Sequence, residues 1–392
     1  MILIKHELIS ELNRLLITGN NMKNIGWIFI LVGMLGFSSC TKETGKVPDD
    51  AGVYKPTLID PTDIFPAEFG LPVLPKDNPF TEEGVLLGRM LFYDPLLSID
   101  SSISCASCHR QEYAFTEPLD KSVGFRGLRN MRNSMPLFNL AYHHSYFWDS
   151  RAKTLRDLVF EPIQAHNEMA MTLPTLRERL KRNKRYIDYF KKAFNSEPNL
   201  HDMSLAMEQF LLSIVSKDSR FNQFFPGDNL KVLSASELRG AFIYNGLIDF
   251  DANGVTKGAD CFHCHGGELS QQLNAGMGGI ASNGLDPAPV DLGVGGVTNR
   301  SQDMGTFKAP SLLNIAVTAP YMHDGRFKTL EEVIDHYSDG VHYEHPNIHP
   351  QMAAHGGIQL RLSQQQKDDL VAYLRSMTDS TFLNNPAYSN PF

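Results

Sequence analysis

The chain has 392 residues, enough for two or three compact domains of roughly 100–200 residues each. Hydrophobic residues make up 42% of the sequence and charged residues 20%, as in an ordinary globular protein. The formal net charge of -8 argues against a nucleic-acid partner, and no run of basic residues resembles a membrane-binding patch.

The N-terminal segment has the pattern of a secretory signal. Lys23 precedes an apolar stretch over residues 25–37, and small residues then lead to Cys40. The apolar stretch is shorter than the about 20 residues that a membrane-spanning helix needs. The sequence before Cys40 resembles a bacterial lipoprotein cleavage site, and a plain signal peptide or an anchor is the alternative. We predict a signal region over residues 1–39, with the lipoprotein signal at 22–39, and lipid attachment at Cys40.

A polar stretch follows the predicted cleavage site. Residues 40–60 contain prolines and glycines among polar side chains, a composition typical of a tether. We therefore expect the protein in the periplasm or cell envelope, held to a membrane by its N-terminal lipid.

Four of the five cysteines fall into two Cys-x-x-Cys-His motifs. In such a motif, two thiols add to the vinyl groups of a porphyrin and the histidine binds the iron from one face. A zinc site is the alternative, but its free thiols would be unstable outside the cell. The motifs predict two covalently bound c-type haems, attached through Cys105, Cys108, Cys261 and Cys264 and ligated by His109 and His265.

Part of the sequence occurs twice, 175 positions apart. Asn139 recurs as Asn314, and the segment around Trp148 recurs around His323 without a gap. The two haem motifs are 156 positions apart, so the intervening segments differ in length. This pattern indicates a duplicated unit that carries one haem. We expect His323, as the counterpart of Trp148, to lie near the interface between the two haems.

Helical periodicity predicts a mainly α fold. Residues 173–194 and 364–377 have apolar side chains at helical spacing, and few segments alternate as strands do. Glycines and prolines over residues 276–296 indicate a long irregular connection. We predict two cytochrome-c-like domains, at residues 61–225 and 226–392, each with one c-type haem and packed around a shared interface between the haems.

The two copies differ on the side of the haem opposite the histidine. The helical spacing from Leu330 to Tyr337 places Tyr337 on a buried face and turns His336 away from it. Pro162 occupies the position that matches Tyr337 in the first copy, and proline has no side chain able to bind iron. The second haem can therefore have Tyr337 as a further ligand, with an ordinary core tyrosine as the alternative. The first haem keeps an open site, which suits peroxide binding.

A histidine-rich segment follows Tyr337 in the sequence. A metal site is one interpretation, but nearby prolines and paired glycines favour a surface loop. The histidines are His342, His345, His349 and His355.

Several spaced motifs between residues 80 and 377 resemble the bacterial di-haem cytochrome c peroxidase family. That family also contains the di-haem enzyme that matures the tryptophan-derived cofactor of methylamine dehydrogenase. The motifs are Leu91-Phe-Tyr-Asp-Pro, Ser104-Cys-Ala-Ser-Cys-His, Arg132-Asn133, Phe147-Trp-Asp-Ser-Arg, Asn167-Glu-Met, Phe307-Lys-Ala-Pro and Thr318-Ala-Pro-Tyr-Met-His-Asp-Gly.

The resemblance implies roles for five further residues. Trp148 matches the tryptophan that lies between the two haems and carries electrons or holes. Glu168 matches the acid–base carboxylate beside the open haem, where cleavage of peroxide needs a proton to be moved. Asn133, Thr318 and Pro320 match a calcium site between the haems, built from one amide oxygen and two backbone carbonyls.

Two departures from the typical peroxidase pattern resemble the cofactor-maturing branch. Peroxidases that rest in an inactive form have a histidine that caps the first iron, and Phe125 stands at that position here. Tyr337 stands where typical peroxidases have an axial methionine, and a phenolate would stabilise ferric iron. Leu158 also differs from the glutamine that is common in the family.

The resemblance implies an enzyme that reduces hydrogen peroxide with electrons from a small cytochrome or a similar donor. A basic donor would suit the acidic net charge. One alternative is a di-haem oxidase that modifies residues of a partner protein, and another is a non-enzymatic electron-transfer cytochrome. The last would need a sixth ligand on the first haem, against which Phe125 and Pro162 argue. Homodimers are common in the family, although the sequence carries no interface signal.

Overall fold

The structure is a computed structural model, and it describes residues 54–225, 229–246, 249–251, 254–256, 258–267, 269–270, 279–353 and 359–392. The predicted signal region and Cys40 lie outside these residues. Tyr54–Phe392 forms one compact unit. A search of the described residues finds no helix with the length and apolar character needed to cross a membrane.

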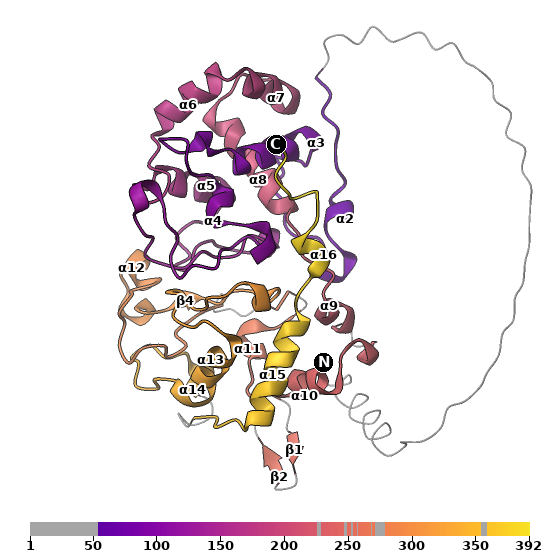
Figure 1. Cartoon of the computed structure of the whole chain (residues 1–392), viewed down its shortest axis with the longest axis vertical. Helices are drawn as coiled ribbons and strands as arrows, with labels where there is room; N and C mark the ends of the chain where they lie inside the picture. Colours follow the sequence, from indigo (N-terminus) through magenta and orange to yellow (C-terminus); the bar gives the residue numbers. More distant parts are fainter. Residues whose placement is uncertain are drawn as a thin grey trace, which may run out of the picture. The chain divides into compact units, whose positions relative to one another are not determined.

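The described chain is mainly helical, as predicted, and long irregular loops join the helices (Figure 1). Its α-helices are α2 (Pro61–Ile64), α3 (Glu82–Tyr93), α4 (Cys105–Cys108), α5 (Leu155–Gln164), α6 (Leu173–Arg182), α7 (Lys184–Phe194), α8 (Leu200–Ser213), α9 (Arg220–Phe224), α10 (Ala235–Tyr244), α11 (Phe262–His265), α12 (Gly295–Thr298), α13 (Leu330–Asp335), α14 (Pro350–Ala353), α15 (Gln364–Ser376) and α16 (Ser380–Leu383). The strands β1 (Asp249–Asp251) and β2 (Gly254–Thr256) pair antiparallel, as do β3 (Ile280–Ala281) and β4 (Phe307–Lys308).

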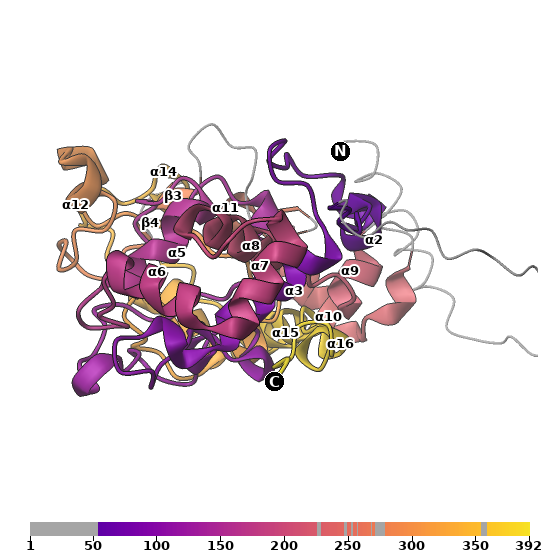
Figure 2. The same ribbon diagram turned by 90° about the horizontal axis from the view of Figure 1, so that it is seen from above.

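Helix α8 is the centre of the first half of the molecule. Its residues from Met203 to Leu212 are all buried, and α3, α5 and α7 pack against it. Figure 2 shows α3, α7 and α8 side by side, as Figure 1 does. Helices α3 and α8 approach closely at Gly88, where a Cβ atom would meet the Ala206 carbonyl oxygen at 2.0 Å. The crossing therefore requires a residue without a side chain.

Helices α10 and α15 form the corresponding pair in the second half. They pack along one another, with Gly240 at the contact. A Cβ atom at Gly240 would meet the Asp369 carbonyl oxygen at 2.0 Å and the Tyr373 Cβ atom at 2.8 Å. The same helix crossing, with the same glycine contact, is thus built twice in the chain.

Two predicted helical segments have different outcomes. The segment 364–377 is confirmed as α15, which ends at Ser376. The segment 173–194 is also helical, as predicted, but it divides into α6 and α7 at Asn183. The Asn183 side chain accepts a hydrogen bond from the Arg185 backbone N–H at 3.0 Å and so begins a new helix.

The C-terminal tail returns to the first half. The Phe382 ring lies 5.8 Å from the Phe115 ring and 5.7 Å from the Phe138 ring, centroid to centroid. The Tyr93 hydroxyl donates to the Tyr388 carbonyl oxygen at 2.8 Å, and the C-terminus lies beside α3 in Figure 1. The last residues therefore complete the hydrophobic core of the half that begins the chain.

Candidate functional site

Two cavities each contain one Cys-x-x-Cys-His motif. The first is lined by Cys105, Cys108 and His109, and the second by Cys261, Cys264 and His265. All four cysteines are free. The rest of each lining is largely apolar, which suits a flat hydrophobic cofactor attached at its edge.

In the first cavity, a hydrogen bond to the backbone orients the histidine. His109 follows helix α4, and its Nδ1 atom lies 2.8 Å from the Phe115 carbonyl oxygen. Burial lowers the pKa of His109, so the ring is neutral. A neutral ring that donates through Nδ1 keeps a lone pair on Nε2, which is the arrangement an iron ligand needs. Burial raises the pKa of the Cys105 and Cys108 thiols to about 12.

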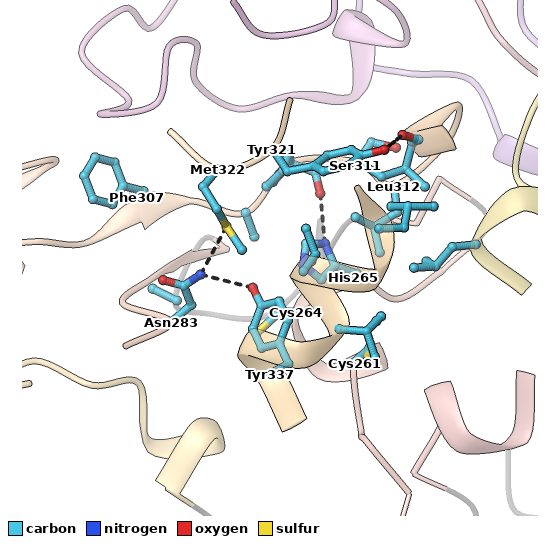
Figure 3. Close-up of a pocket in the computed structure, with 18 of the residues that line it drawn as sticks. Cys261, Cys264, His265, Asn283, Phe307, Ser311, Leu312, Tyr321, Met322 and Tyr337 are labelled. Carbon is cyan, nitrogen blue, oxygen red and sulfur yellow. Dashed lines mark hydrogen bonds between the residues drawn. The ribbon is translucent and has the colours of Figure 1, made fainter. Parts of the chain in front are cut away.

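The second cavity holds its histidine in the same way (Figure 3). The Nδ1 atom of His265 lies 2.9 Å from the Pro310 carbonyl oxygen. Burial lowers the pKa of His265 to about 4 and raises the pKa of Cys261 to about 12. The donor set is therefore two neutral thiols and one oriented neutral imidazole in each cavity, and it fits a covalently attached haem.

Tyr337 lies in the second cavity, on a π-helical turn that the sequence pattern does not reveal. Helix α13 ends at Asp335, and the π turn His336–Gly340 follows it. The Asn283 side-chain amide donates to the Tyr337 hydroxyl at 3.1 Å, and burial raises the pKa of this phenol to about 12. His336, which the helical spacing turns away from the buried face, is nevertheless buried in the structure, with its Nε2 atom 3.3 Å from the Asn283 carbonyl oxygen. A π turn inside a helix is frequent at functional sites.

Met322 is a second potential iron ligand that the sequence reasoning missed. Its sulfur atom lies 3.6 Å from the Asn283 amide nitrogen, on the same group that bonds Tyr337. Figure 3 shows the Met322 sulfur and the Tyr337 hydroxyl both directed toward Asn283. The repeat could have drawn attention to this position, because the second copy has a methionine, Met322, where the first copy has Phe147. A methionine sulfur can bind haem iron, whereas a phenylalanine ring cannot. The geometry therefore leaves a phenol and a thioether as candidates in one cavity.

Pro162 and Glu168 line the first cavity, and Leu158 lies there as well. Burial raises the pKa of Glu168, while the nearby Arg151 guanidinium opposes this effect. Arg151 is itself held by an ion pair with Asp149 at 3.0 Å. A carboxyl group with a raised pKa beside an apolar cavity is suited to accept a proton and to donate it again.

The loop that carries Phe125 is fixed against the backbone of Glu168. The Phe125 N–H donates to the Glu168 carbonyl oxygen at 2.7 Å, and the Asn167 side chain donates to the Asn130 side-chain oxygen at 2.8 Å. A Cβ atom at Gly124 would meet the Asn167 carbonyl oxygen at 2.1 Å. This close backbone contact holds the Glu168 segment in place beside the cavity.

Trp148 lines both cavities. Its indole N–H donates to the Asn133 carbonyl oxygen at 2.9 Å, and the Asn133 N–H donates to the His323 carbonyl oxygen at 2.8 Å. The His323 ring is buried and stacks on Phe307, with 4.0 Å between ring centroids. The backbone of Asn133 thus joins the two residues that correspond in the repeat, between the two cavities.

Asn133, Thr318 and Pro320 all line the second cavity. The Asn133 amide nitrogen donates to the Leu119 carbonyl oxygen at 3.0 Å, an orientation that directs the amide oxygen away from this contact. Oxygen atoms of this kind suit calcium. The calcium site stays a prediction, because the resemblance alone assigns it.

The histidine-rich segment does not form a metal cluster in the described part of the chain. No group of three histidine, cysteine or acidic side chains there could hold a metal ion. The His342 ring pairs with Glu344 at 2.9 Å, and the His345 ring lies 3.1 Å from the Ser282 hydroxyl. His355 lies outside the described residues.

Two cavities with paired Cys-x-x-Cys-His motifs on a helical frame define a c-type cytochrome with two haem sites. The chain belongs to the di-haem cytochrome c peroxidase family, whose sequence profile matches residues 82–230. It is therefore a haem peroxidase, and the family uses hydrogen peroxide, two c-type haems and a redox partner such as a small cytochrome.

Relatives of two kinds are similar to this chain. The methylamine utilization protein MauG of Methylorubrum extorquens is 32% identical over 77% of this chain and 80% of its own length. The cytochrome c551 peroxidase of Pseudomonas aeruginosa is 30% identical over 88% of this chain and 90% of its own length. A crystal structure of a MauG-like protein associated with microbial copper homeostasis matches with a TM-score of 0.71 and 31% identity, covering 83% of this chain and 98% of that one.

Proposed function

We propose that this chain reduces hydrogen peroxide to water at the first cavity, with electrons that enter through the second. Glu168 carries this assignment, because its half-buried carboxyl group lines the first cavity and has a raised pKa. His109 and His265 would bind the two irons, with Cys105, Cys108, Cys261 and Cys264 as the attachment points. Haem iron bound there supplies a site for O–O cleavage and stores oxidising equivalents.

The protein's own residues handle the proton and the path between the cavities. Glu168 accepts a proton from one oxygen of peroxide and returns it to the other, so that the departing oxygen leaves as water. The loop at Phe125 keeps Glu168 in place without a histidine that must first be displaced. Trp148, which lines both cavities, is the aromatic link for electron transfer between them.

Further assignments rest on the sequence pattern. Tyr337 would bind the second iron, with Met322 as the competing candidate. Asn133, Thr318 and Pro320 provide oxygen ligands for calcium between the halves. A lipid on Cys40 anchors the protein to a membrane facing the periplasm or cell envelope.

The test is oxidation of reduced cytochrome c by peroxide, using the purified protein with both haems fully oxidised. We expect turnover without prior reduction, because Phe125 cannot cap an iron. The matched comparison is the same assay after partial reduction, which should give the same rate. A requirement for reduction would contradict the open first site, and no turnover under either condition would contradict the proposed electron donor.

A second candidate is an oxidase that modifies residues of a partner protein. The presence of Tyr337 in the second cavity favours it, as does the similarity to MauG proteins. Peroxide alone would then produce an oxidised spectrum that persists for minutes in the absence of cytochrome c. Rapid decay of that spectrum together with fast cytochrome oxidation would exclude this candidate.

A further inference from the structure

A single lysine lies in the wall between the two cavities. Lys308 belongs to β4, and its backbone N–H donates to the Trp148 carbonyl oxygen at 2.9 Å. In the described part of the chain, Lys308 is the only charged residue that lines both cavities. The shared lining residues are Asn133, Ser134, Pro136, Trp148, Lys308, Pro310 and Ser311.

The Lys308 side chain forms two hydrogen bonds among the described residues, and neither partner is a carboxylate. Its Nζ atom lies 2.9 Å from the His143 Nδ1 atom and 3.2 Å from the Ser145 carbonyl oxygen. Two arginines of the first cavity are different, because Arg132 and Arg151 each form ion pairs with carboxylates. Lys308 is thus a half-buried cation in the wall between the cavities, and the described protein provides no carboxylate to pair with it.

Such a cation is costly to bury unless an anion accompanies it. Burial lowers the pKa of Lys308 to about 7, and no carboxylate among the described residues offsets this shift. Each c-type haem would bring carboxylate side chains into its cavity. These carboxylates are the anions that the proposed function itself places beside Lys308.

The repeat shows that the charge is specific to one copy. The offset of 175 positions makes Asn133 the counterpart of Lys308, and Asn133 also lines both cavities. One copy therefore contributes a neutral amide at the shared wall and the other contributes an ammonium group. The positive charge of Lys308 is therefore common to two otherwise similar cavities.

We propose that Lys308 is the shared cation of the two cavities, pairing with a haem carboxylate and raising the reduction potential of both haems. This inference rests on the proposed binding of one haem in each cavity. A positive charge stabilises the reduced iron, because reduction lowers the charge of the haem. A charge in the common wall acts on both irons and keeps their potentials close to the range in which Trp148 can exchange electrons between them.

The experiment measures the midpoint potentials of both haems by spectroelectrochemical titration of the intact protein without peroxide. Lys308→Gln removes the charge but keeps a hydrogen-bond donor, whereas Lys308→Arg keeps the charge. Lys328→Met is the matched control, because Lys328 is an exposed lysine that lines neither cavity. Haem content is determined for each variant, so that loss of a haem is separated from a change of potential.

We expect Lys308→Gln to make both haems harder to reduce, by about tenfold in the reduction equilibrium, or about 59 mV for one electron. Lys308→Arg and Lys328→Met should leave both potentials close to those of the unmodified protein. A shift of only one potential, or of neither, with both haems retained would overturn the shared role. If Lys308→Gln loses a haem, an equal loss in Lys308→Arg would also overturn it, since the charge is then irrelevant.

Titration without peroxide separates this inference from the proposed function. Absence of two haems in the purified protein would contradict the proposed function before Lys308 is tested. Loss of peroxide turnover with unchanged potentials would contradict only the role of Lys308 in setting them.

Discussion

The two cavities share a frame and differ in a few side chains. Each frame uses a glycine at its main helix crossing, Gly88 in the first half and Gly240 in the second. In each, a tyrosine hydroxyl donates to a carbonyl six residues before it, at 3.3 Å for Tyr146 and 3.0 Å for Tyr321. The duplicated scaffold therefore explains why the two cavities are similar, but it does not explain a difference in their functions.

The difference lies on the side opposite the ligating histidine. In the first half, helix α5 continues past Pro162 and ends at Gln164. In the second half, the corresponding helix changes to a π turn and places Tyr337 in the cavity. Pro162 and Glu168 line one cavity, whereas the phenol of Tyr337 lies in the other. Under the proposed function, this small local change separates a site for peroxide chemistry from a site for electron transfer.

Removing the carboxyl group from the first cavity should have the largest effect on the difference between the two cavities. Glu168→Gln should lower kcat for peroxide about 100-fold to 10,000-fold, because the group that moves the proton is lost. Haem content should not change. Stopped-flow measurement of peroxide turnover tests this prediction, with exposed Glu178→Gln as the control. Activity near that of the unmodified protein would remove Glu168 from the mechanism.

Opening the second cavity tests its assigned ligand. Tyr337→Phe should change the spin state of the second haem from low to high in the optical and electron paramagnetic resonance spectra. Met322→Leu should leave the spectra unchanged, because it removes only the thioether near Asn283. The opposite pattern would assign the ligand to Met322 and leave Tyr337 as a buried tyrosine.

The shared frame can be tested with the two crossing glycines. Gly88→Ala and Gly240→Ala should each reduce the free energy of unfolding by about 1–3 kcal/mol, since each new methyl group overlaps a carbonyl oxygen. Gly296→Ala in α12 is the control, because its Cβ atom would have only one contact, at 3.4 Å. Chemical denaturation provides the measurement. A large loss for one crossing and none for the other would show that the two frames are not equivalent.

The smallest effect concerns pH. Glu168 must be ionised to accept the first proton, and burial raises its pKa above the ordinary value of 4.5. Turnover should therefore rise with pH through this raised pKa, and the rising limb should lie above pH 4.5. A profile of kcat/KM against pH checks the position of the limb. If the rising limb of the profile is still present in Glu168→Gln, another group is responsible for the titration.

The cysteine motifs and the repeat could be predicted from sequence because covalent chemistry and duplication leave fixed spacings. The π turn at Tyr337 could not, since the spacing from Leu330 to Tyr337 is the same for a regular helix. Asn183 divides a periodic segment whose apolar side chains continue on both sides, so the break is visible only through its capping bond. Lys308 stands in a recognisable motif, but its burial between two cavities depends on how distant segments pack.

The return of the C-terminal tail has a consequence for the order in which the protein matures. The chain is synthesised from its N-terminus, yet the aromatic cluster around Phe115 includes Phe382. The first half therefore stays open on this side until the last residues arrive. Completion of the core around Phe115 therefore depends on the far end of the chain, although the haem motif of that half lies only a few residues before Phe115.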